Sequence, residues 1–136
     1  MGSEMCIRDS FNFDSAAGII YTVDVTKPKG EKVTITSMAD GTPFSLDKMY
    51  KVALNSYRGN GGGELLTKGS GISQDELKDR ILYSTDKDLR YYLMQYIEKK
   101  GVIEPHALGL WKFIPEEWVE PAAKRDYEYL FGKVEK

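Results

Sequence analysis

The feature that most constrains the fold of this chain is a glycine-dense segment that follows an alternating run. Tyr50, Val52 and Leu54 alternate with more polar residues, which is the period of a half-buried strand. Four of the five residues from Gly59 to Gly63 are glycine. Because glycine has no Cβ atom, the backbone there can turn sharply and approach a ligand or another backbone closely. The segment predicts a strand that enters a close-approach loop, although an ordinary turn has the same composition.

The residue types around this loop favour a planar ligand over a phosphate group. Tyr57 precedes the glycines and offers a flat ring with a polar tip, which could stack on a nucleobase. A dinucleotide-binding fingerprint is not met, because Glu64 occupies the third glycine position. A P-loop is not met either, since no Gly-Lys-Ser/Thr ends the segment.

Residues 55–64 resemble the loop of 5'-nucleotidase C-terminal domains, in which an aromatic residue, a short spacer, Asn and a Gly-Gly-Asp-Gly turn follow a strand of the Tyr-Lys-Val type. Tyr57 falls on the family's base-stacking phenylalanine. Asn60, Gly61 and Gly62 fall on its Asn-Gly-Gly. The resemblance implies that this loop recognises the nucleoside part of a substrate.

Two positions depart from the family's pattern. Gly63 stands where the family usually has an aspartate that accepts hydrogen bonds from the ribose hydroxyls, and Glu64 stands where glycine is usual. Glu64 could replace that acceptor from the next position. The substrate-binding set that the resemblance implies is Asn55, Tyr57, Arg58, Asn60, Gly61, Gly62, Gly63 and Glu64.

The resemblance extends toward the start of the chain. Residues 11–24 are similar to the family's segment in which a Phe-x-x-x-Gly-Gly-type turn enters a strand ending in Tyr-Asp, and the Lys-Pro-Lys-Gly-Glu-Lys-Val turn that follows also fits. We therefore expect residues 11–136 to form a partial 5'-nucleotidase C-terminal (substrate-binding) domain, truncated on its N-terminal side. Residues 1–10 resemble a translated adaptor and are interpreted as a non-native head, so Cys6 and Arg8 are assigned no function.

Length and charge limit the class of partner. A chain of 136 residues is about one domain. Its formal net charge of -2 argues against nucleic acid or an anionic membrane, since both favour a basic face. No segment approaches the roughly 20 consecutive apolar residues of a membrane span. These properties favour a binding module for a small ligand.

Catalytic metal chemistry is not predicted within this chain. A two-metal phosphohydrolase site needs several His, Asp and Asn ligands around ions roughly 3.5–4 Å apart. The single histidine, His106, has no partner at ligand spacing and is interpreted as a solvated loop residue. The resemblance implies that a metallophosphoesterase domain, supplied in cis or in trans, holds the divalent metal ions. The chain alone is not expected to be active.

The first half of the chain predicts a sheet. Two β-rich runs, Gly18–Thr26 and Lys32–Ser37, are joined by hairpin-like turn residues. With residues 50–57 as a third strand, they predict an antiparallel meander. The side chains expected to face its core are Tyr21, Val23 and Val25.

The second half predicts mainly helices. Ser73 and Glu76 form a capping-box pattern that opens a short helix to about Asp79, and residues 81–84 are interpreted as a brief strand. A second helix, capped by Thr85, ends at Gly101. Apolar and aromatic residues recur along one face of that helix at the spacing of a buried face, namely Leu89, Tyr92, Leu93, Tyr96 and Ile97. This spacing favours core packing of the tyrosines over the alternative that they form an aromatic ligand-binding site.

The last third is divided by prolines. A strand is predicted around residues 110–114 and a helix over residues 122–131, after Pro121. Trp111 and Trp118 could pack within the domain or onto a partner, and the intradomain interpretation is favoured. The fold class predicted overall is α+β, an antiparallel or mixed sheet with packed helices, resembling the layered 5'-nucleotidase C-terminal domain.

Two hypotheses of function remain. In the first, the chain is the nucleoside- or nucleotide-recognition part of a bacterial 5'-nucleotidase that hydrolyses nucleoside 5'-monophosphates, for which the resemblance implies a periplasmic or cell-surface location. In the second, it is a noncatalytic ligand-binding or protein-interaction module. The glycine at position 63 keeps the second hypothesis open.

Overall fold

The computed structural model describes residues 14–132. These divide into two compact units, which we call the sheet unit (residues 14–48 and 107–132) and the helical unit (residues 49–106). The predicted head at residues 1–10, with Cys6 and Arg8, lies outside the described residues. Within the described part of the chain, no helix is long and apolar enough to cross a bilayer.

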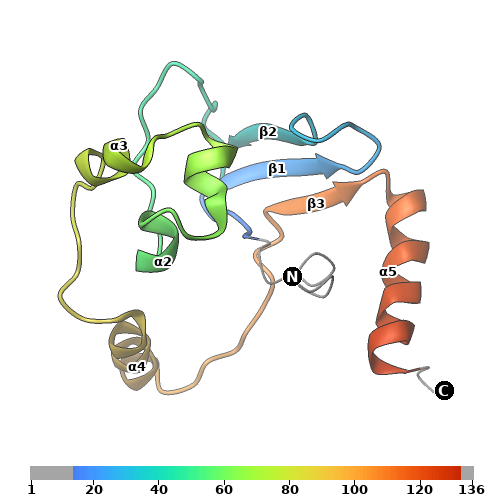
Figure 1. Ribbon diagram of the computed structural model, residues 1–136. Coiled ribbons are helices and arrows are strands. Elements are labelled where there is room, and N and C mark those ends of the chain that lie inside the picture. The colour runs from blue at the N-terminus through green and yellow to red at the C-terminus, as the bar shows by residue number, and fades with distance from the viewer. Residues whose placement is uncertain (1–13, 133–136) are drawn as a thin grey trace, which may run out of the picture. The chain divides into compact units, whose positions relative to one another are not determined.

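The sheet unit is built on three strands in the order β2-β1-β3 (Figure 1). β1 (Ile19–Asp24) pairs antiparallel with β2 (Val33–Met38) and parallel with β3 (Trp111–Ile114). Strand β1 is therefore central, and the sheet is mixed. Together with the helices this gives an α+β fold, as the sequence predicts.

Tyr21 anchors the core of the sheet unit. Tyr21 and Val23 are buried on β1, as predicted, whereas Val25 lies beyond the end of the strand and is exposed. The Tyr21 ring stacks on Trp111 with centroids 5.8 Å apart, and Trp111 meets Phe113 edge to face at 5.1 Å. This aromatic contact joins β1 to a strand almost 90 residues later in the chain, and it confirms intradomain packing for Trp111. Trp118 is 64% exposed, so the same prediction is wrong for Trp118.

The turns of the sheet unit follow from short polar side chains. After β1, Asp24 Oδ1 accepts hydrogen bonds from the backbone N–H and the hydroxyl of Thr26, at 3.0 and 2.6 Å. Asp40 and Thr42 repeat the same arrangement after β2, at 2.9 and 2.7 Å. These bonds lower the pKa of both carboxyls below the usual aspartate value. The turn predicted between the two β-rich runs is also formed, with the Glu31 N–H donating to the Pro28 carbonyl at 3.2 Å.

The meander prediction is wrong in its third strand. Residues 50–55 have no regular secondary structure, and Val52 and Leu54 are exposed. A meander would place its third strand on the outer edge of β2, whereas the third strand of this sheet is β3, on the other side of β1. An alternating sequence sets the period of the side chains but supplies no partner for the backbone, and without a partner the strand does not form.

The last helix of the sheet unit, α5 (Glu116–Phe131), begins six residues earlier than predicted. Pro121 lies inside it, where its missing N–H removes one hydrogen bond, the one to the carbonyl of exposed Glu117. Glu116 and Glu117 stand in the first turn, where carboxylates suit the helix dipole. Glu116 also pairs with Lys112 at 2.6 Å, and this contact lowers its pKa.

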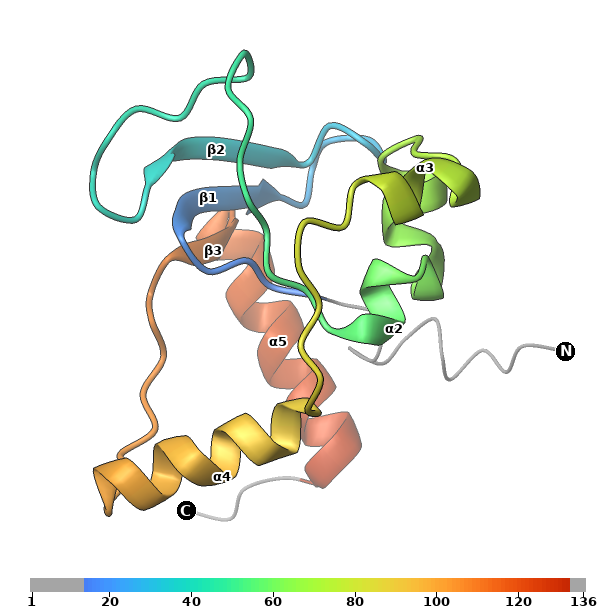
Figure 2. The ribbon, with the colours of Figure 1, turned by 90° about the vertical axis from the view of Figure 1, so that its left-hand side faces the viewer.

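The helical unit contains α2 (Ser56–Gly59), the one-turn segments η2 (Gly62–Glu64) and η3 (Leu65–Gly69), α3 (Gln74–Asp79) and α4 (Leu89–Lys100). In the two ribbon views the green coil that follows α2 lies beside α3 (Figures 1 and 2). Leu77 on α3 is the buried apolar side chain of this unit, 4% exposed. The residues between α3 and α4 have no regular structure, so the brief strand predicted at residues 81–84 is not formed.

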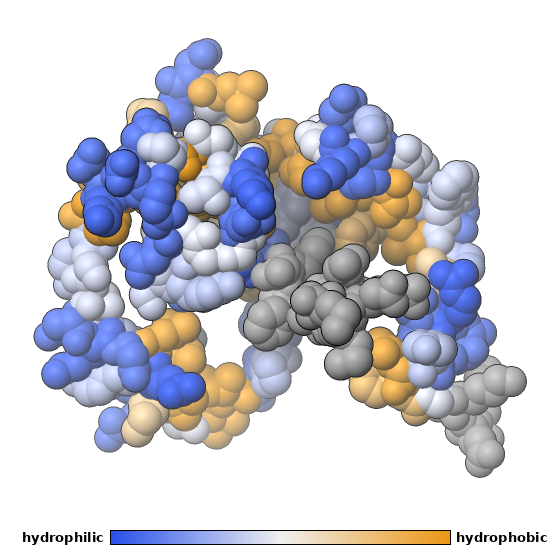
Figure 3. All heavy atoms as spheres, in the orientation of Figure 1, coloured by the Kyte–Doolittle hydropathy of each residue, from blue (hydrophilic) through white to orange (hydrophobic). Residues whose placement is uncertain are grey.

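Helix α4 matches the predicted period but not the predicted burial. Asp88, not Thr85, caps it, because Asp88 Oδ1 accepts the N–H of Tyr91 at 2.9 Å, while the Thr85 hydroxyl donates to the Lys87 carbonyl. Gly101 ends the helix at φ 74°, as predicted. The five residues of the predicted core face are between 38% and 64% exposed, and apolar residues reach the surface around α4 in Figure 3. The prediction that this face is buried is therefore wrong.

Candidate functional site

The glycine-dense segment folds as a corner made of short helical turns, which we call the glycine corner (residues 55–64). Asn55 caps the single turn of α2, with its Oδ1 accepting the N–H of Arg58 at 2.8 Å. Asn60 closes the same turn by donating its N–H to the carbonyl of Ser56 at 3.0 Å. The two asparagines therefore act locally through a capping side chain and a backbone N–H. They begin and end the single helical turn that carries Tyr57.

Positive backbone angles then reverse the chain. Gly61 has φ 88° and Gly63 has φ 71°, values that L-residues with a side chain rarely adopt. Glu64 also has a positive φ, 60°, which costs roughly 1–2 kcal/mol in a residue with a Cβ atom. The Glu64 N–H donates to the carbonyl of Gly61 at 3.1 Å and closes the turn. Glycine at 61 and 63 is thus required by the backbone itself.

At position 62, glycine is required because there is no room for a side chain. A Cβ atom at this position would lie 2.6 Å from two carbons of the Tyr57 ring and from the Tyr57 carbonyl oxygen. No side chain can be accommodated there without moving the ring or the backbone. The absence of a side chain at Gly62 therefore leaves the room in which the Tyr57 ring lies.

Tyr57 presents its ring at the surface of this corner. The residue is 57% exposed, and the Arg58 guanidinium lies 5.3 Å from the ring centroid. A cation placed over an aromatic face is attracted by the ring quadrupole. Tyr57 is thus an accessible aromatic surface whose orientation is supported by its two neighbours, Arg58 and Gly62.

Arg58 supports the corner from inside. Only 6% of its surface is exposed, and its guanidinium donates to the Gly62 carbonyl at 3.2 Å. The guanidinium is therefore held inside the corner, against the Gly62 carbonyl and the Tyr57 ring. The geometry assigns Arg58 to the support of Tyr57 and Gly62.

Glu64 is held on the outside of the corner. Its Oε1 lies 2.7 Å from Lys68 Nζ one helical turn later, and both side chains are more than half exposed. Exposed pairs of this kind contribute about 0–1 kcal/mol. The Glu64 carboxylate is therefore engaged by Lys68 but remains accessible to solvent.

Helix α3 lies against the glycine corner through two residues that the sequence did not single out as site residues. Gln74 Nε2 donates to the carbonyl of Asn60 at 3.0 Å. A Cβ atom on Gly61 would lie 2.7 Å from Gln74 Oε1 and 3.2 Å from Leu77 Cδ1. The signal that could have found these contacts is the capping box, because it fixes where α3 begins.

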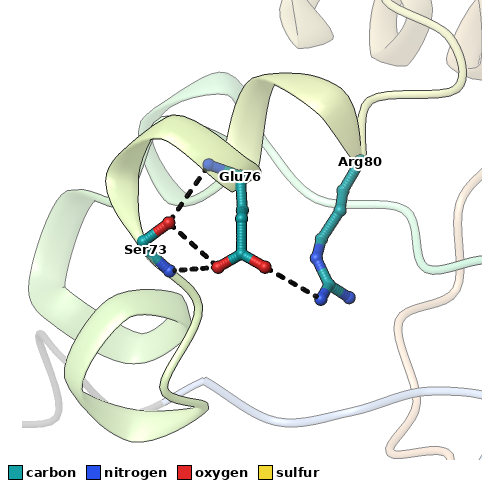
Figure 4. Close-up of polar contacts among 3 residues, drawn as sticks. All are labelled: Ser73, Glu76 and Arg80. Carbon is teal, nitrogen blue, oxygen red and sulfur yellow. Dashed lines mark hydrogen bonds and ion pairs between the residues drawn. The ribbon is translucent and has the colours of Figure 1, made fainter.

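The capping box is formed as predicted (Figure 4). Ser73 Oγ accepts the N–H of Glu76 at 3.3 Å, and Glu76 Oε2 accepts the N–H and the hydroxyl of Ser73 at 3.0 and 2.9 Å. Arg80 approaches the other carboxylate oxygen at 3.8 Å. The Ser73 backbone and hydroxyl donors, followed by Arg80, lower the pKa of Glu76 below its usual range.

Two other places in the described chain were candidates for a binding site, the single histidine and a hollow in the sheet unit, and both have fewer features of one. His106 is exposed, with Nδ1 at 3.2 Å from the carbonyl of Glu104, and residues 14–132 contain no cluster of three or more His, Cys, Asp or Glu side chains suited to a metal ion. A hollow of about 390 Å³ in the sheet unit has no charged residue in its lining. It is lined by Ser15, Ala16, Ala17, Ala107, Leu108, Gly109, Leu110 and Trp111.

Comparison with known proteins places the glycine corner in a family. Residues 5–68 match the family described as 5'-nucleotidase, C-terminal domain. This segment of the chain belongs to that family. The match contains the first two strands and the whole glycine corner, so the 5'-nucleotidase domain resemblance read from the loop is confirmed at the level of the family.

Two curated relatives extend the similarity. The chain is 31% identical over 117 residues to the trifunctional nucleotide phosphoesterase protein YfkN of Bacillus subtilis (strain 168), and 29% identical over 121 residues to the 2',3'-cyclic-nucleotide 2'-phosphodiesterase/3'-nucleotidase of Haemophilus influenzae (strain ATCC 51907 / DSM 11121 / KW20 / Rd). Each alignment covers 78% of this chain but only 8% and 17% of the two relatives. No solved structure matches the chain significantly.

Proposed function

We propose that this chain contributes the nucleoside-recognition part of a nucleotide-hydrolysing enzyme of the 5'-nucleotidase type. The observation that carries the proposal is the Tyr57 ring, which is half exposed and supported by Arg58 and Gly62. An aromatic face fixed in this way suits stacking on a base. The names of the two relatives, both of which act on nucleotides, support a nucleoside over other planar ligands.

Stacking alone gives weak binding. Removal of an aromatic platform costs roughly 1–3 kcal/mol per base, which is about 5- to 150-fold in affinity. With one tyrosine as the platform, adenosine should bind this chain only weakly, with a dissociation constant of roughly 5 mM or higher. Tighter binding would need a second aromatic surface and the phosphate contacts of a complete enzyme.

Ribose recognition is proposed to involve Glu64. Its carboxylate is exposed and lies beside Gly63, the position that carries the acceptor in the resembling family. To engage ribose, Glu64 would exchange the exposed Lys68 pair for the ribose hydroxyls, and such a pair is weak enough to be exchanged. Glu64→Gln should therefore weaken adenosine binding but leave binding of 2',3'-dideoxyadenosine unchanged.

Hydrolysis itself is proposed to come from a metallophosphoesterase domain, in cis or in trans, which holds divalent metal ions. Such ions would polarise the phosphoryl group and activate water. We expect the 136-residue chain, supplied with Mn²⁺ or Zn²⁺ alone, to release no phosphate from AMP above a metal-only blank. A bacterial periplasmic or cell-surface setting is part of the same proposal.

The test is a nuclear magnetic resonance titration of the chain with adenosine. Tyr57→Ala should lose binding, and Tyr57→Phe should retain it because the ring remains. Tyr129→Ala, a change at an 84% exposed tyrosine on α5, is the matched control and should bind as the wild type does. Equal affinity of the wild type and Tyr57→Ala would refute the stacking role.

A second candidate function, a protein-interaction module, is favoured by one observation. The apolar face of α4 is exposed, as Tyr92, Leu93 and Ile97 show. An amphipathic helix with an open apolar face is one of the common modes of protein recognition. If the chain bound no nucleoside at any concentration, this candidate would replace the first.

A further inference from the structure

We infer that Gln74 is a positioning residue for the glycine corner, and this inference rests on the proposed nucleoside-binding function. Gln74 belongs to α3, outside the loop that carries the aromatic platform. Its side chain holds the corner at the point where α2 ends and the positive-φ residues begin. The inference is that α3 sets the conformation of the nucleoside-binding loop through this one amide.

The geometry of Gln74 is specific at both ends of its amide. Nε2 donates to the carbonyl of Asn60 at 3.0 Å, across 14 positions of the chain. Oε1 lies 2.7 Å from the place where a Cβ atom on Gly61 would stand. The amide therefore occupies the space that the absent Gly61 side chain leaves. Any larger residue at 61 would displace the group that anchors Asn60.

The sequence around Gln74 explains why its amide is aimed at the corner. Ser73 caps α3, and Glu76 returns its carboxylate to the Ser73 N–H and hydroxyl (Figure 4). This reciprocal capping fixes Gln74 as the first residue of the helix. Leu77, one turn later, is buried beside Gly61 and holds α3 against the corner.

The chain of contacts reaches the aromatic platform in two steps. Asn60, which Gln74 holds, ends the helical turn that carries Tyr57. Gly62, two residues after Asn60, lies against the Tyr57 ring and leaves no room for a Cβ atom between them. A shift of the Asn60 carbonyl would therefore change the position of Gly62 relative to the ring and make the stacking surface less well defined.

The first experiment uses the full 136-residue chain with adenosine as the probe. Gln74→Met keeps the length of the side chain but removes the hydrogen bond, and it should weaken adenosine binding by about 2- to 10-fold, the effect of one lost hydrogen bond. Wild-type affinity in Gln74→Met, with binding lost in Tyr57→Ala, would overturn the role of Gln74 and leave the proposed function intact. The reverse pattern would overturn stacking by Tyr57 and keep Gln74 as the positioning residue.

Gln74→Glu gives a readout that loss of stability would not produce. A carboxylate at this position repels the Asn60 carbonyl, whereas a protonated carboxyl can donate to it, so the pKa of the introduced group should be raised. Adenosine affinity of this variant, measured relative to the wild type, should recover as the pH falls from 7.5 to 4.5. Gln74→Met should show no such recovery. Parallel pH profiles in the two variants would contradict the inference.

A final measurement needs no ligand. In the free chain, Gln74→Met should shift the amide signals of Gly61 and Gly62 and speed amide exchange at Glu64, which donates to Gly61. The amides of α4 should not change. Unchanged signals at the glycine corner would refute a positioning role whether or not adenosine binds.

Discussion

Gly62→Ala is the change that most sharply tests how the glycine corner is built. The new Cβ atom would stand 2.6 Å from the Tyr57 ring and from the Tyr57 carbonyl oxygen, whereas ordinary contacts begin at 3.4 Å. The ring can rotate away, but the carbonyl belongs to the backbone of α2 and cannot. Overpacking of this kind costs typically about 1–3 kcal/mol. The smaller unfolded-state entropy of alanine offsets about 0.4–1 kcal/mol of that cost.

Gly59→Ala is the matched control, three residues away. Gly59 has no positive φ, and a Cβ atom there would meet nothing within 4 Å. In this variant the lower entropy of the unfolded state stabilises the fold with no steric cost against it, and alanine also prefers the helical turn of α2. We therefore expect Gly59→Ala to stabilise the helical unit by about 0.4–1 kcal/mol. The same glycine-to-alanine change should thus raise the stability of the helical unit at position 59 and lower it at position 62.

The assay is native-state amide hydrogen exchange, which reports the opening of one unit at a time. Suitable reporters are the Glu64 N–H, bonded to the Gly61 carbonyl at 3.1 Å, and the Leu77 N–H, bonded to the Ser73 carbonyl at 3.2 Å. Gly62→Ala should reduce their protection about 5- to 30-fold, the equivalent of 1–2 kcal/mol. Protection equal to or above that of Gly59→Ala would show that Gly62 does not hold the Tyr57 ring as described.

Three further predictions concern other parts of the chain. Trp111→Ala removes the Tyr21 stack and should lower the free energy of unfolding of the sheet unit by about 2–4 kcal/mol in urea titrations, whereas Trp118→Ala, at a 64% exposed residue, should change it by less than about 0.5 kcal/mol. The lowered pKa of Glu76 means that its stabilising effect on α3 is complete above the unfolded value of about 4.3 and is lost as the pH falls through the lower folded value. Amide exchange in α3 should therefore accelerate at acid pH in the wild type, and less so in Ser73→Ala; equal acceleration would contradict this. Glu64→Gln, which breaks an exposed pair, should leave the free energy of unfolding within about 0.5 kcal/mol of the wild type, and a larger loss would mean that the Lys68 pair is structural.

Local chemistry made much of the fold predictable. The hairpin of β1 and β2 follows from two β-rich runs joined by turn residues, and α3 follows from its Ser73 and Glu76 cap. Each of these signals acts within a few residues. The sequence could not show that β3 pairs with β1, because that contact joins distant parts of the chain, and it predicted residues 50–57 as the third strand instead.

Burial was less predictable than helical period. The spacing on α4 correctly indicates a helix with an apolar face, but an amphipathic pattern does not say whether a partner is present. At the glycine corner the sequence identified the platform, Tyr57, and the glycines around it. It could not assign Arg58 to the interior, nor find Gln74, since both roles depend on which backbone carbonyl each side chain reaches.

The central claim is that the Tyr57 ring is the surface on which a nucleobase stacks. The most direct measurement is the set of intermolecular nuclear Overhauser effects between adenosine and the aromatic side chains of the chain. We expect contacts between the adenine ring protons and Tyr57, together with shifts of the Gly61 and Gly62 amides. Contacts to the exposed tyrosines of α4 instead, with no signal at Tyr57, would contradict the claim.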